Sequence, residues 1–184
     1  MTTSTMQIPG FTAGQWTIDQ AHSHIGFAVK HMMVSKVRGQ FGTFSGGITL
    51  GADPLHSNVT VVIDAESIDT NSAGRDDHLR QPDFFDVATH PQITFQSTGV
   101  RRGDGAYLID GTLSLRGITK PVTLTVDTPE FGPTPDGGRK AGFSAVTEIR
   151  RSDFGITYNG PLPGGGLALS DTVQIILDIE ADPA

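Results

Sequence analysis

Apolar and polar residues alternate along most of this chain, from Trp16 to Glu180. The segment 122–127 reads VTLTVD and the segment 173–179 reads VQIILDI, each with apolar residues two positions apart. Because successive side chains of an extended strand point to opposite faces, this period predicts strands with one apolar and one polar face. About seven further segments show the same pattern, namely 16–18, 25–30, 44–50, 59–66, 93–97, 107–115 and 143–150.

Sequences rich in Gly, Pro and Asp separate the alternating segments, as at 103–105, 135–138 and 163–166. Such residues form tight turns between antiparallel strands. A chain of many half-apolar strands must close into a barrel or stack as a sandwich to hide its sheet edges. The sequence has no repeat of fixed period, which argues against a propeller. We therefore expect an all-β fold of the barrel or sandwich type.

Two segments interrupt the alternation, and the first is HMMVSKVRGQ at 31–40. The spacing of Met32, Met33, Val34 and Val37 suits a short helix or an irregular crossing.

The second interruption, GRDDHLRQPDFFDVATHP at 74–91, concentrates charged residues, histidines and two adjacent phenylalanines. Asn71 or Ser72 could cap a helix whose first turn is acidic, which suits the helix dipole. Pro82 would end that helix, because a proline disfavours helical geometry in the residue before it. Residues 83–86 would then form a further turn. We expect one broken helical excursion that covers an open end or an edge of the barrel.

Composition places the chain among globular proteins and excludes several functions. Its 184 residues fit one domain, and we expect a flexible arm over 1–13 followed by a single domain over 14–184. The net charge is −7 and the longest basic run is a pair, so a nucleic-acid-binding stripe is absent from the sequence. Without cysteine, the chain forms no disulfide and has no thiol nucleophile.

The sequence also bears on location. No run approaches the roughly 18 apolar residues of a transmembrane helix. The start MTTSTMQIPGF lacks the basic and then apolar pattern of a secretory signal. We expect a cytoplasmic protein.

The apolar faces of the predicted strands mix small and large residues. A barrel of about eight strands either fills its interior with side chains or holds one small ligand. Small inward residues favour a cavity, although glycines can equally mark bulges and bends in a packed core. Both readings stay open from the pattern alone. The small residues are Gly46, Ser97, Gly111, Ala145 and Thr147.

Several motifs resemble the YceI-like family of lipid-binding proteins, also called the polyisoprenoid-binding family. They include W-T-I-D-x-x-H-S-H-I-G-F at 16–27, R-D-D-H-L-x-x-P-D-F-F-D at 75–86 and D-G-T-L-S-L-R-G-I-T-K-P-V at 110–122. The resemblance extends over nearly the whole chain, to Glu180. It implies a lipocalin-like antiparallel β-barrel of about eight strands, with a short helical lid near its mouth. It also implies that the interior is hollow and holds a long isoprenoid or similar amphiphile.

On this basis the interruption at 74–91 becomes the helical lid. Arg75 and Asp76 could pair with each other or with neighbouring strands, and with His78 they could brace the lid on the barrel rim. Phe84 and Phe85 would either seal the barrel or touch a lipid tail. The residues that we expect to contact the ligand are Phe27, Val29, His31, Phe41, Phe44, Leu79, Phe84, Phe85, Phe95, Leu113, Phe143 and Phe154.

A phosphorylated head group would need a base near the mouth. The candidates are Arg38, Arg75, Arg80 and Lys120.

Metal and catalytic sites find little support in the sequence. His22 and His24 are two positions apart, so on a strand they face opposite ways. The histidines show no spacing typical of a zinc site. There is no G-x-S-x-G nucleophile motif, and the glycines at 164–166 lack the lysine and helix of a phosphate-binding loop. We predict no catalytic residue, metal or cofactor.

The first functional hypothesis is binding, sequestration or transport of a long-chain isoprenoid or similar amphiphilic lipid. Burial of a tail needs only an apolar lining, and such a lining leaves a diffuse signature on inward strand positions. An enzyme acting on such a lipid in the same cavity is one alternative. A packed-core interaction module, which could act as a homodimer, is another.

Overall fold

Antiparallel strands make up most of the molecule. The computed structural model describes residues 7–160, 162 and 168–184. The turn expected at 163–166 and the first part of the predicted arm, 1–6, lie outside the described residues. The strands are β1 Gly14–Ile18, β2 His24–His31, β3 Ser35–Phe41, β4 Phe44–Leu50, β5 Asn58–Asp64, β6 Ile68–Asp69, β7 Gln92–Arg102, β8 Tyr107–Leu115, β9 Ile118–Val126, β10 Glu130–Pro133, β11 Arg139–Arg150 and β12 Leu169–Pro183. The helices are α1 Ala73–Leu79 and the short 3₁₀ turns η1 Gln20–His22, η2 Pro54–His56, η3 Ala65–Ser67 and η4 Arg151–Phe154.

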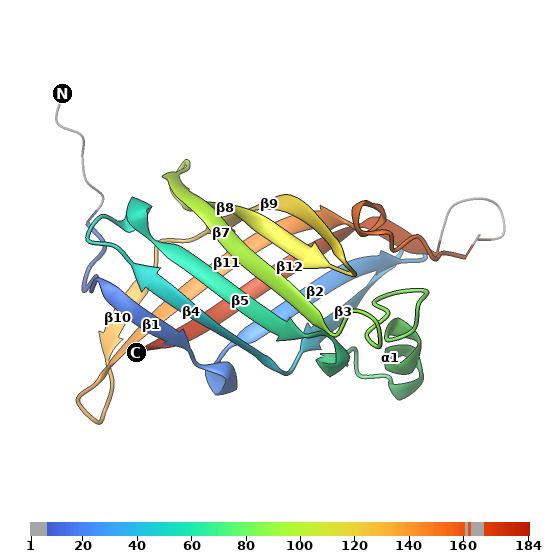
Figure 1. The fold of residues 1–184 in the computed structure, drawn as a ribbon, viewed down its shortest axis with the longest axis horizontal. Coiled ribbons are helices and arrows are strands. Elements are labelled where there is room, and N and C mark those ends of the chain that lie inside the picture. Colours follow the sequence, from blue (N-terminus) through green and yellow to red (C-terminus); the bar gives the residue numbers. More distant parts are fainter. Residues whose placement is uncertain (1–6, 161, 163–167) are drawn as a thin grey trace.

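The strands close a ring in the order β11-β9-β8-β7-β5-β4-β1-β12, and β12 pairs again with β11 (Figure 1). All neighbours in this ring of eight strands are antiparallel. The predicted lipocalin-like barrel of about eight strands with a helical segment is therefore confirmed. Closure pairs the strands around the ring, which removes most of the free edges that an open sheet would expose.

The last strand is shared between two partners on one side. Residues 181–183 of β12 pair with β1, whereas 169–178 pair with β2. The β2–β3 hairpin thus continues the wall at the end of the barrel that carries α1, which we call the helical end (Figure 1). At this end β3 pairs with the short β6 only through Gln40 and Phe41. Along 35–39, β3 pairs with no further strand in the described part of the chain.

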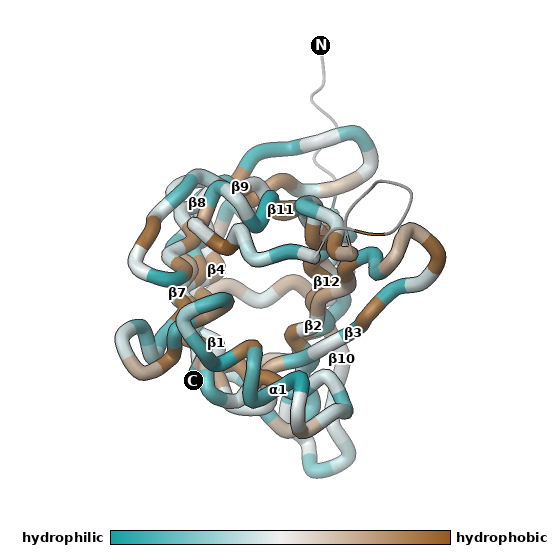
Figure 2. Tube along the Cα trace, turned by 90° about the vertical axis from the view of Figure 1, so that its right-hand side faces the viewer, coloured by the Kyte–Doolittle hydropathy of each residue, from teal (hydrophilic) through white to brown (hydrophobic). Residues whose placement is uncertain are grey.

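The α1 segment lies along one side of the ring at the helical end, as Figure 2 shows from that end. Ser72 is the N-cap residue of α1, although its side chain makes no capping bond. After α1 the chain folds back on itself: Phe85 N–H donates to the Leu79 carbonyl (2.9 Å) and Val87 N–H to the Arg80 carbonyl (3.0 Å). The broken helical excursion predicted for 74–91 is confirmed. No helix in the described ranges has the length and apolar character required to cross a membrane.

The segment 31–40 forms the turn and second strand of the β2–β3 hairpin, so the expected helix or irregular crossing is wrong. Val29 lies opposite Val37 in the ladder, and the turn is closed by Val34 N–H donating to the His31 carbonyl (3.2 Å). The Met32 and Met33 side chains, which suggested a helix face, lie in this exposed turn. The turn has neither Gly nor Asn, so its sequence carries no ordinary turn signal.

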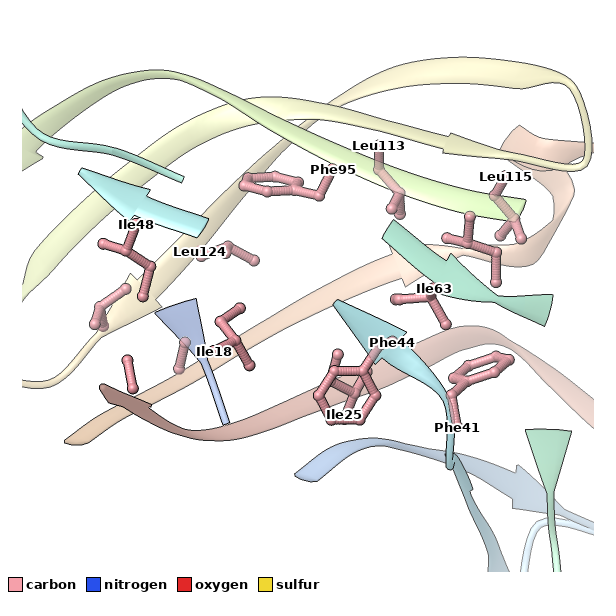
Figure 3. Close-up of a cluster of buried hydrophobic side chains, with 14 of the residues drawn as sticks. Ile18, Ile25, Phe41, Phe44, Ile48, Ile63, Phe95, Leu113, Leu115 and Leu124 are labelled. Atoms are coloured by element: carbon pink, nitrogen blue, oxygen red, sulfur yellow. The ribbon is translucent and has the colours of Figure 1, made fainter. Parts of the chain in front are cut away.

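Side chains from all round the ring converge on the barrel interior. Figure 3 shows buried residues of this layer, including Ile18, Ile48, Ile63 and Leu124 from four different strands. Because these residues follow the period of two, the alternation read from the sequence correctly separates inner from outer faces.

Two inward glycines accommodate aromatic rings. A Cβ atom at Gly111 would overlap the ring of Phe95, and one at Gly39 would overlap the ring of Phe27. These glycines therefore accommodate phenylalanines from neighbouring strands, as expected where a glycine faces a bulky residue in a strand.

The second part of the predicted arm packs on the barrel. Ile8 is buried, and the ring of Phe11 lies edge-on to that of Phe131, with centroids 5.6 Å apart. Trp16 contacts the same ring at 5.6 Å. Within the expected arm, residues 8–11 therefore pack against the barrel, and Ile8 and Phe11 line its interior.

Candidate functional site

The barrel interior contains a cavity of about 560 Å³. Its wall is formed by apolar side chains from nearly every strand, and it runs from Ile8 and Phe11 at one end to Tyr158 at the helical end. Such a volume falls within the roughly 300–1,000 Å³ of typical ligand pockets. The barrel is therefore hollow, although the rings of Phe95 and Phe27 occupy the space beside two of its inward glycines.

Most of the predicted contact residues lie on the cavity wall. Those that line it are Phe27, Val29, His31, Phe41, Leu79, Phe84, Phe85, Phe95, Leu113 and Phe143. Phe44 and Phe154 do not. Phe44 is buried in the packed layer beside its ladder partner Ile63, and Phe154 is fully buried within η4. Both are core residues, and a burial pattern alone does not separate core from cavity wall.

The helical end of the cavity is its more polar end. Two guanidinium groups, Arg75 and Arg151, line it together with Thr70, His78 and Tyr158. Tyr158 is 46% exposed although it lines the cavity. The cavity therefore reaches solvent here, beside α1.

Arg75 is held by a short polar network. Its Nε donates to the Thr70 hydroxyl and its Nη2 to the Thr70 carbonyl, both at 2.7 Å. The Thr70 hydroxyl and N–H donate in turn to the buried carboxylate of Asp76. Arg75 and Asp76 are thus linked through Thr70, as a brace of the lid. The position of Arg75 on the wall also leaves it available to a ligand.

Arg151 is the second base on the wall, and its side chain is buried. Nε donates to the Ser170 carbonyl (2.9 Å), and Nη1 donates to the carbonyls of Ile156 and Tyr158 (3.2 Å each). Burial lowers the pKa of the guanidinium from its ordinary value, and the charge of Asp171 partly offsets this. Arginine still stays protonated in proteins.

An aromatic cluster lies where the lid meets the segment after η4. The rings of His78, Phe84 and Tyr158 contact one another with centroids 5.0–5.2 Å apart. His78 Nε2 also lies 2.9 Å from the carboxylate of Asp83. The cluster joins the lid to the rim at the mouth.

The other three head-group candidates lie away from the cavity. Arg80 donates to the carbonyls of Glu66 (3.0 Å) and Ile68 (3.2 Å), so it clamps the lid to the preceding turn. Arg38 is exposed on the outer face of β3, and Lys120 is exposed on β9. Of the four, only Arg75 lines the cavity.

The sequence reasoning missed Arg151 and Tyr158. Arg151 follows a strand and opens the motif R-x-D-F-G at 151–155. This motif could have pointed to Arg151, because the sequence RSDFG interrupts the alternation of apolar and polar residues at 151–155.

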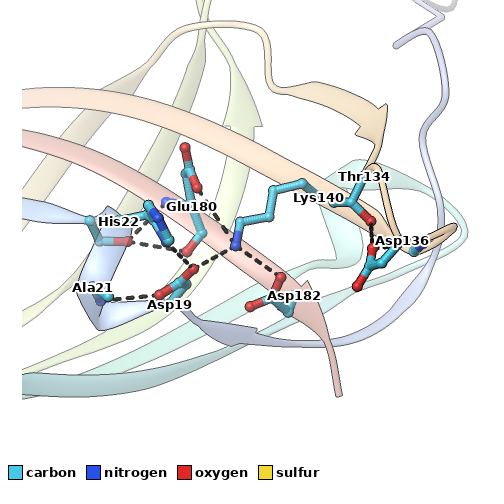
Figure 4. A network of polar contacts seen from close by, with 10 residues as sticks. Asp19, Ala21, His22, Thr134, Asp136, Lys140, Glu180 and Asp182 are labelled. Carbon is cyan, nitrogen blue, oxygen red and sulfur yellow. Dashed lines mark hydrogen bonds and ion pairs between the residues drawn. The ribbon is translucent and has the colours of Figure 1, made fainter.

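At the opposite end, acidic side chains gather around an ammonium group (Figure 4). Lys140 Nζ contacts the carboxylates of Asp19, Asp182 (3.0 Å) and Glu180 (3.6 Å), and His22 also bonds Asp19. Lys140 and His22 together hold the pKa of Asp19 well below its usual range, and Asp19 raises that of Lys140. The atoms of Asp19, His22 and Glu180 are close enough to bind a cation. Because Lys140 Nζ already contacts the carboxylates of Asp19 and Glu180, we assign no metal to this cluster.

The chain is similar to known proteins in both sequence and fold. A UPF0312 protein of Yersinia pestis (strain Pestoides F) is 41% identical over 179 residues, covering 92% of this chain and 90% of that protein. Burkholderia cenocepacia BcnA has a TM-score of 0.74 at 26% identity, over 89% of this chain and 98% of that one. A polyisoprenoid binding domain from Saccharophagus degradans shares the fold, with a TM-score of 0.65 at 16% identity over 92% and 98% of the two chains. The sequence profile of the YceI-like domain matches residues 16–181. The resemblance seen in the motifs is thereby confirmed, and this chain belongs to the YceI-like domain family.

Proposed function

We propose that this protein binds a long-chain amphiphile, such as an isoprenoid lipid, with the apolar tail inside the barrel and the polar head at the helical end. The observation that carries the proposal is the apolar cavity of about 560 Å³ with Arg75 and Arg151 at one end. A site built to hold an amphiphile needs this asymmetry. The Saccharophagus degradans domain, which is named for polyisoprenoid binding, has the same fold and supports the ligand class.

The energetics of an apolar tail suit this site. Each buried methylene contributes about 0.8 kcal/mol, so roughly ten of them contribute about 8 kcal/mol before the costs of association. The tail needs no hydrogen bond along the barrel wall. The head group can accept hydrogen bonds from Arg75, whose Nη1 has no partner among the described residues.

Native mass spectrometry of the purified protein, followed by solvent extraction, tests the proposal. We expect one long-chain amphiphile per chain, either as isolated or after incubation with prenyl lipids. A protein that stays empty under both conditions would contradict it.

A matched pair of variants links the ligand to the cavity. Val61→Trp adds a large ring to the cavity wall, and we expect it to abolish lipid retention. Val146→Trp is the control, since Val146 is 46% exposed on the barrel exterior and its substitution leaves the cavity unchanged. If both variants retained lipid equally, the cavity would not be the binding site.

An enzyme acting on the lipid is the alternative function. It would depend on His78, which lines the cavity and bonds the carboxylate of Asp83. A histidine oriented by a carboxylate can act as a general base. Binding and carriage predict that extracted lipid is unchanged in mass after long incubation, whereas turnover predicts a product that disappears in His78→Gln.

A further inference from the structure

The tip of the β2–β3 hairpin exposes three consecutive apolar side chains. Met32, Met33 and Val34 are 49%, 71% and 87% exposed. Elsewhere in the described residues, only Val146 and Tyr158 are large apolar side chains with comparable exposure, and they lie apart from each other in sequence. Contiguous apolar exposure of this kind marks an interaction site more often than single exposed residues do.

The backbone of this tip is unfavourable for the residues it carries. Met32 and Met33 have φ angles of 52° and 62°, in the left-handed region. A turn with positive φ at both central positions favours Asn and Gly, and other side chains are sterically disfavoured there. Folding stability therefore does not explain the two methionines. Residues that break a local rule without a structural gain are expected at functional positions.

Basic residues stand directly behind the apolar tip. Lys30 and Lys36 are ladder partners on the outer face of the hairpin, and Arg38 follows on the same face. The chain carries a net charge of −7, yet it has no Asp or Glu between Asp19 and Asp53. The hairpin is thus a positive and apolar element on an acidic protein.

The surroundings of Lys30, Lys36 and Arg38 bear on why these charges are there. Charged residues on β3 also discourage pairing along its free edge, which accounts for Lys36 and Arg38 but not for Lys30, since β2 is paired on both sides. On the adjacent strand, Asp171 already accepts hydrogen bonds from Ser152 (2.9 and 2.7 Å). Lys30 and Lys36 are exposed, and neither has a salt-bridge partner among the described residues.

The tip adjoins the open end of the cavity. His31, which lines the cavity, directly precedes it. Met32 N–H donates to the carbonyl of Ala168 (2.8 Å), and Ala168 also lines the cavity. The apolar tip therefore lies on the rim through which a ligand would pass.

We propose that the β2–β3 tip docks the protein on an anionic lipid bilayer. Met32, Met33 and Val34 enter the boundary between head groups and acyl chains, while Lys30, Lys36 and Arg38 face the lipid phosphates. Docking places the cavity mouth against the surface that supplies or receives a lipid. Docking by this outer surface does not depend on which ligand the cavity holds.

A membrane fits the tip better than a protein partner or a second copy does. A stable protein interface buries about 800 Å² on each side, and a three-residue hairpin tip offers far less. A bilayer accepts a small apolar insertion when neighbouring bases add electrostatic attraction.

Vesicle flotation with the full chain tests the proposal. We expect binding to vesicles that contain an anionic phospholipid, weaker binding to phosphatidylcholine alone, and loss at high salt. Met32→Asn with Met33→Gly should weaken binding about tenfold or more, since it removes the inserted apolar groups. The same change suits the turn, so the melting temperature should stay unchanged or rise.

Further variants separate the contributions and the alternatives. Lys30→Gln and Lys36→Gln should each weaken binding to anionic vesicles about fivefold. Val146→Thr, which alters an exposed apolar residue elsewhere, should bind as the unaltered protein does. Absence of vesicle binding at low salt, or unchanged binding in the Met32→Asn, Met33→Gly variant, would overturn the proposal. A dimer that this variant dissociates, seen by light scattering, would assign the tip to a second copy.

The test is independent of the proposed lipid-binding function. The vesicles contain no isoprenoid, and the tip residues Met32 and Met33 are not on the cavity wall. Extraction and mass spectrometry of the tip variant should still yield the bound amphiphile. A variant that keeps its amphiphile but loses vesicle binding isolates docking from ligand retention.

Discussion

Arg75 and Thr70 are joined by two hydrogen bonds of 2.7 Å, one to the hydroxyl and one to the carbonyl of the threonine. The pair fixes the guanidinium plane on the cavity wall before any ligand arrives. Preorganisation of this kind reduces the entropy that binding would otherwise cost. Arg75 is therefore the residue of the lid on which head-group recognition should depend most.

Replacing Arg75 with glutamine should weaken binding of a prenyl phosphate more than that of the corresponding free alcohol. An ion pair with the phosphate is lost in the first case, and only a hydrogen bond to an uncharged hydroxyl in the second. Titration of both lipids by fluorescence displacement measures the difference. Lys120→Gln is the control, because Lys120 is exposed on β9 and does not line the cavity. Equal weakening of both lipids would remove Arg75 from head-group recognition.

Replacing Arg151 with methionine should destabilise the barrel by roughly 1–3 kcal/mol, since the carbonyls of Ser170, Ile156 and Tyr158 lose their donor. Urea unfolding gives this difference. The neighbouring Arg150 is largely exposed, so Arg150→Met should change stability little. Equal effects of the two substitutions would mean that the carbonyl bonds of Arg151 contribute nothing specific.

Replacing Gly111 with alanine should also destabilise the fold, by roughly 1–3 kcal/mol, because the added Cβ meets the ring of Phe95 and the carbonyl of Gln96. Gly99 lies on the paired strand, and nothing lies within 4 Å of a Cβ built there. Gly99→Ala should therefore leave the melting temperature nearly unchanged. A matching loss in both variants would point to backbone strain instead of ring packing.

Acid stability should depend on Asp110. Arg101 and Thr123 donate hydrogen bonds to its carboxylate and lower its pKa from 3.8 to about 2. A carboxyl whose folded pKa is depressed stabilises the protein above its ordinary pKa, and this contribution is lost as pH falls through the folded value. The contribution of Asp110 should therefore disappear between pH 3.8 and about 2.

Melting temperatures measured across that range test this prediction. In Asp110→Asn the curve should fall less steeply between the two values than in the unaltered protein. A curve of the same slope would show that the pair with Arg101 does not persist in solution.

The sequence predicted those features that depend on local period. Alternation placed Phe27, Phe95 and Leu113 on the inner face of the wall, because a strand in a closed barrel has only two faces. It also located the lid, since charged residues and a proline cannot continue an inward-facing strand.

Features that arise from long-range folding were not predictable. Arg151 and Tyr158 reach the cavity because η4 and the following segment fold over the rim. The spacing of apolar residues does not indicate this fold of the chain. The sequence did not indicate the β2–β3 turn, because Met32 and Met33 adopt a backbone conformation that normally favours Asn or Gly. Phe44 faces inward as predicted. Alternation does not show, however, whether an inward side chain is packed in the core or lines the cavity.

The sharing of β12 between β1, β2 and β11 has a consequence for biosynthesis. The strand that closes the ring follows the other described strands along the chain, while two of its partners, β1 and β2, precede them. Until residues 169–183 emerge, the early strands keep unpaired edges and the interior has no complete wall. Such edges are prone to aggregate, so a nascent chain of this design depends on rapid final pairing or on chaperones. The cavity wall is therefore complete only after residues 169–183 have been synthesised and paired.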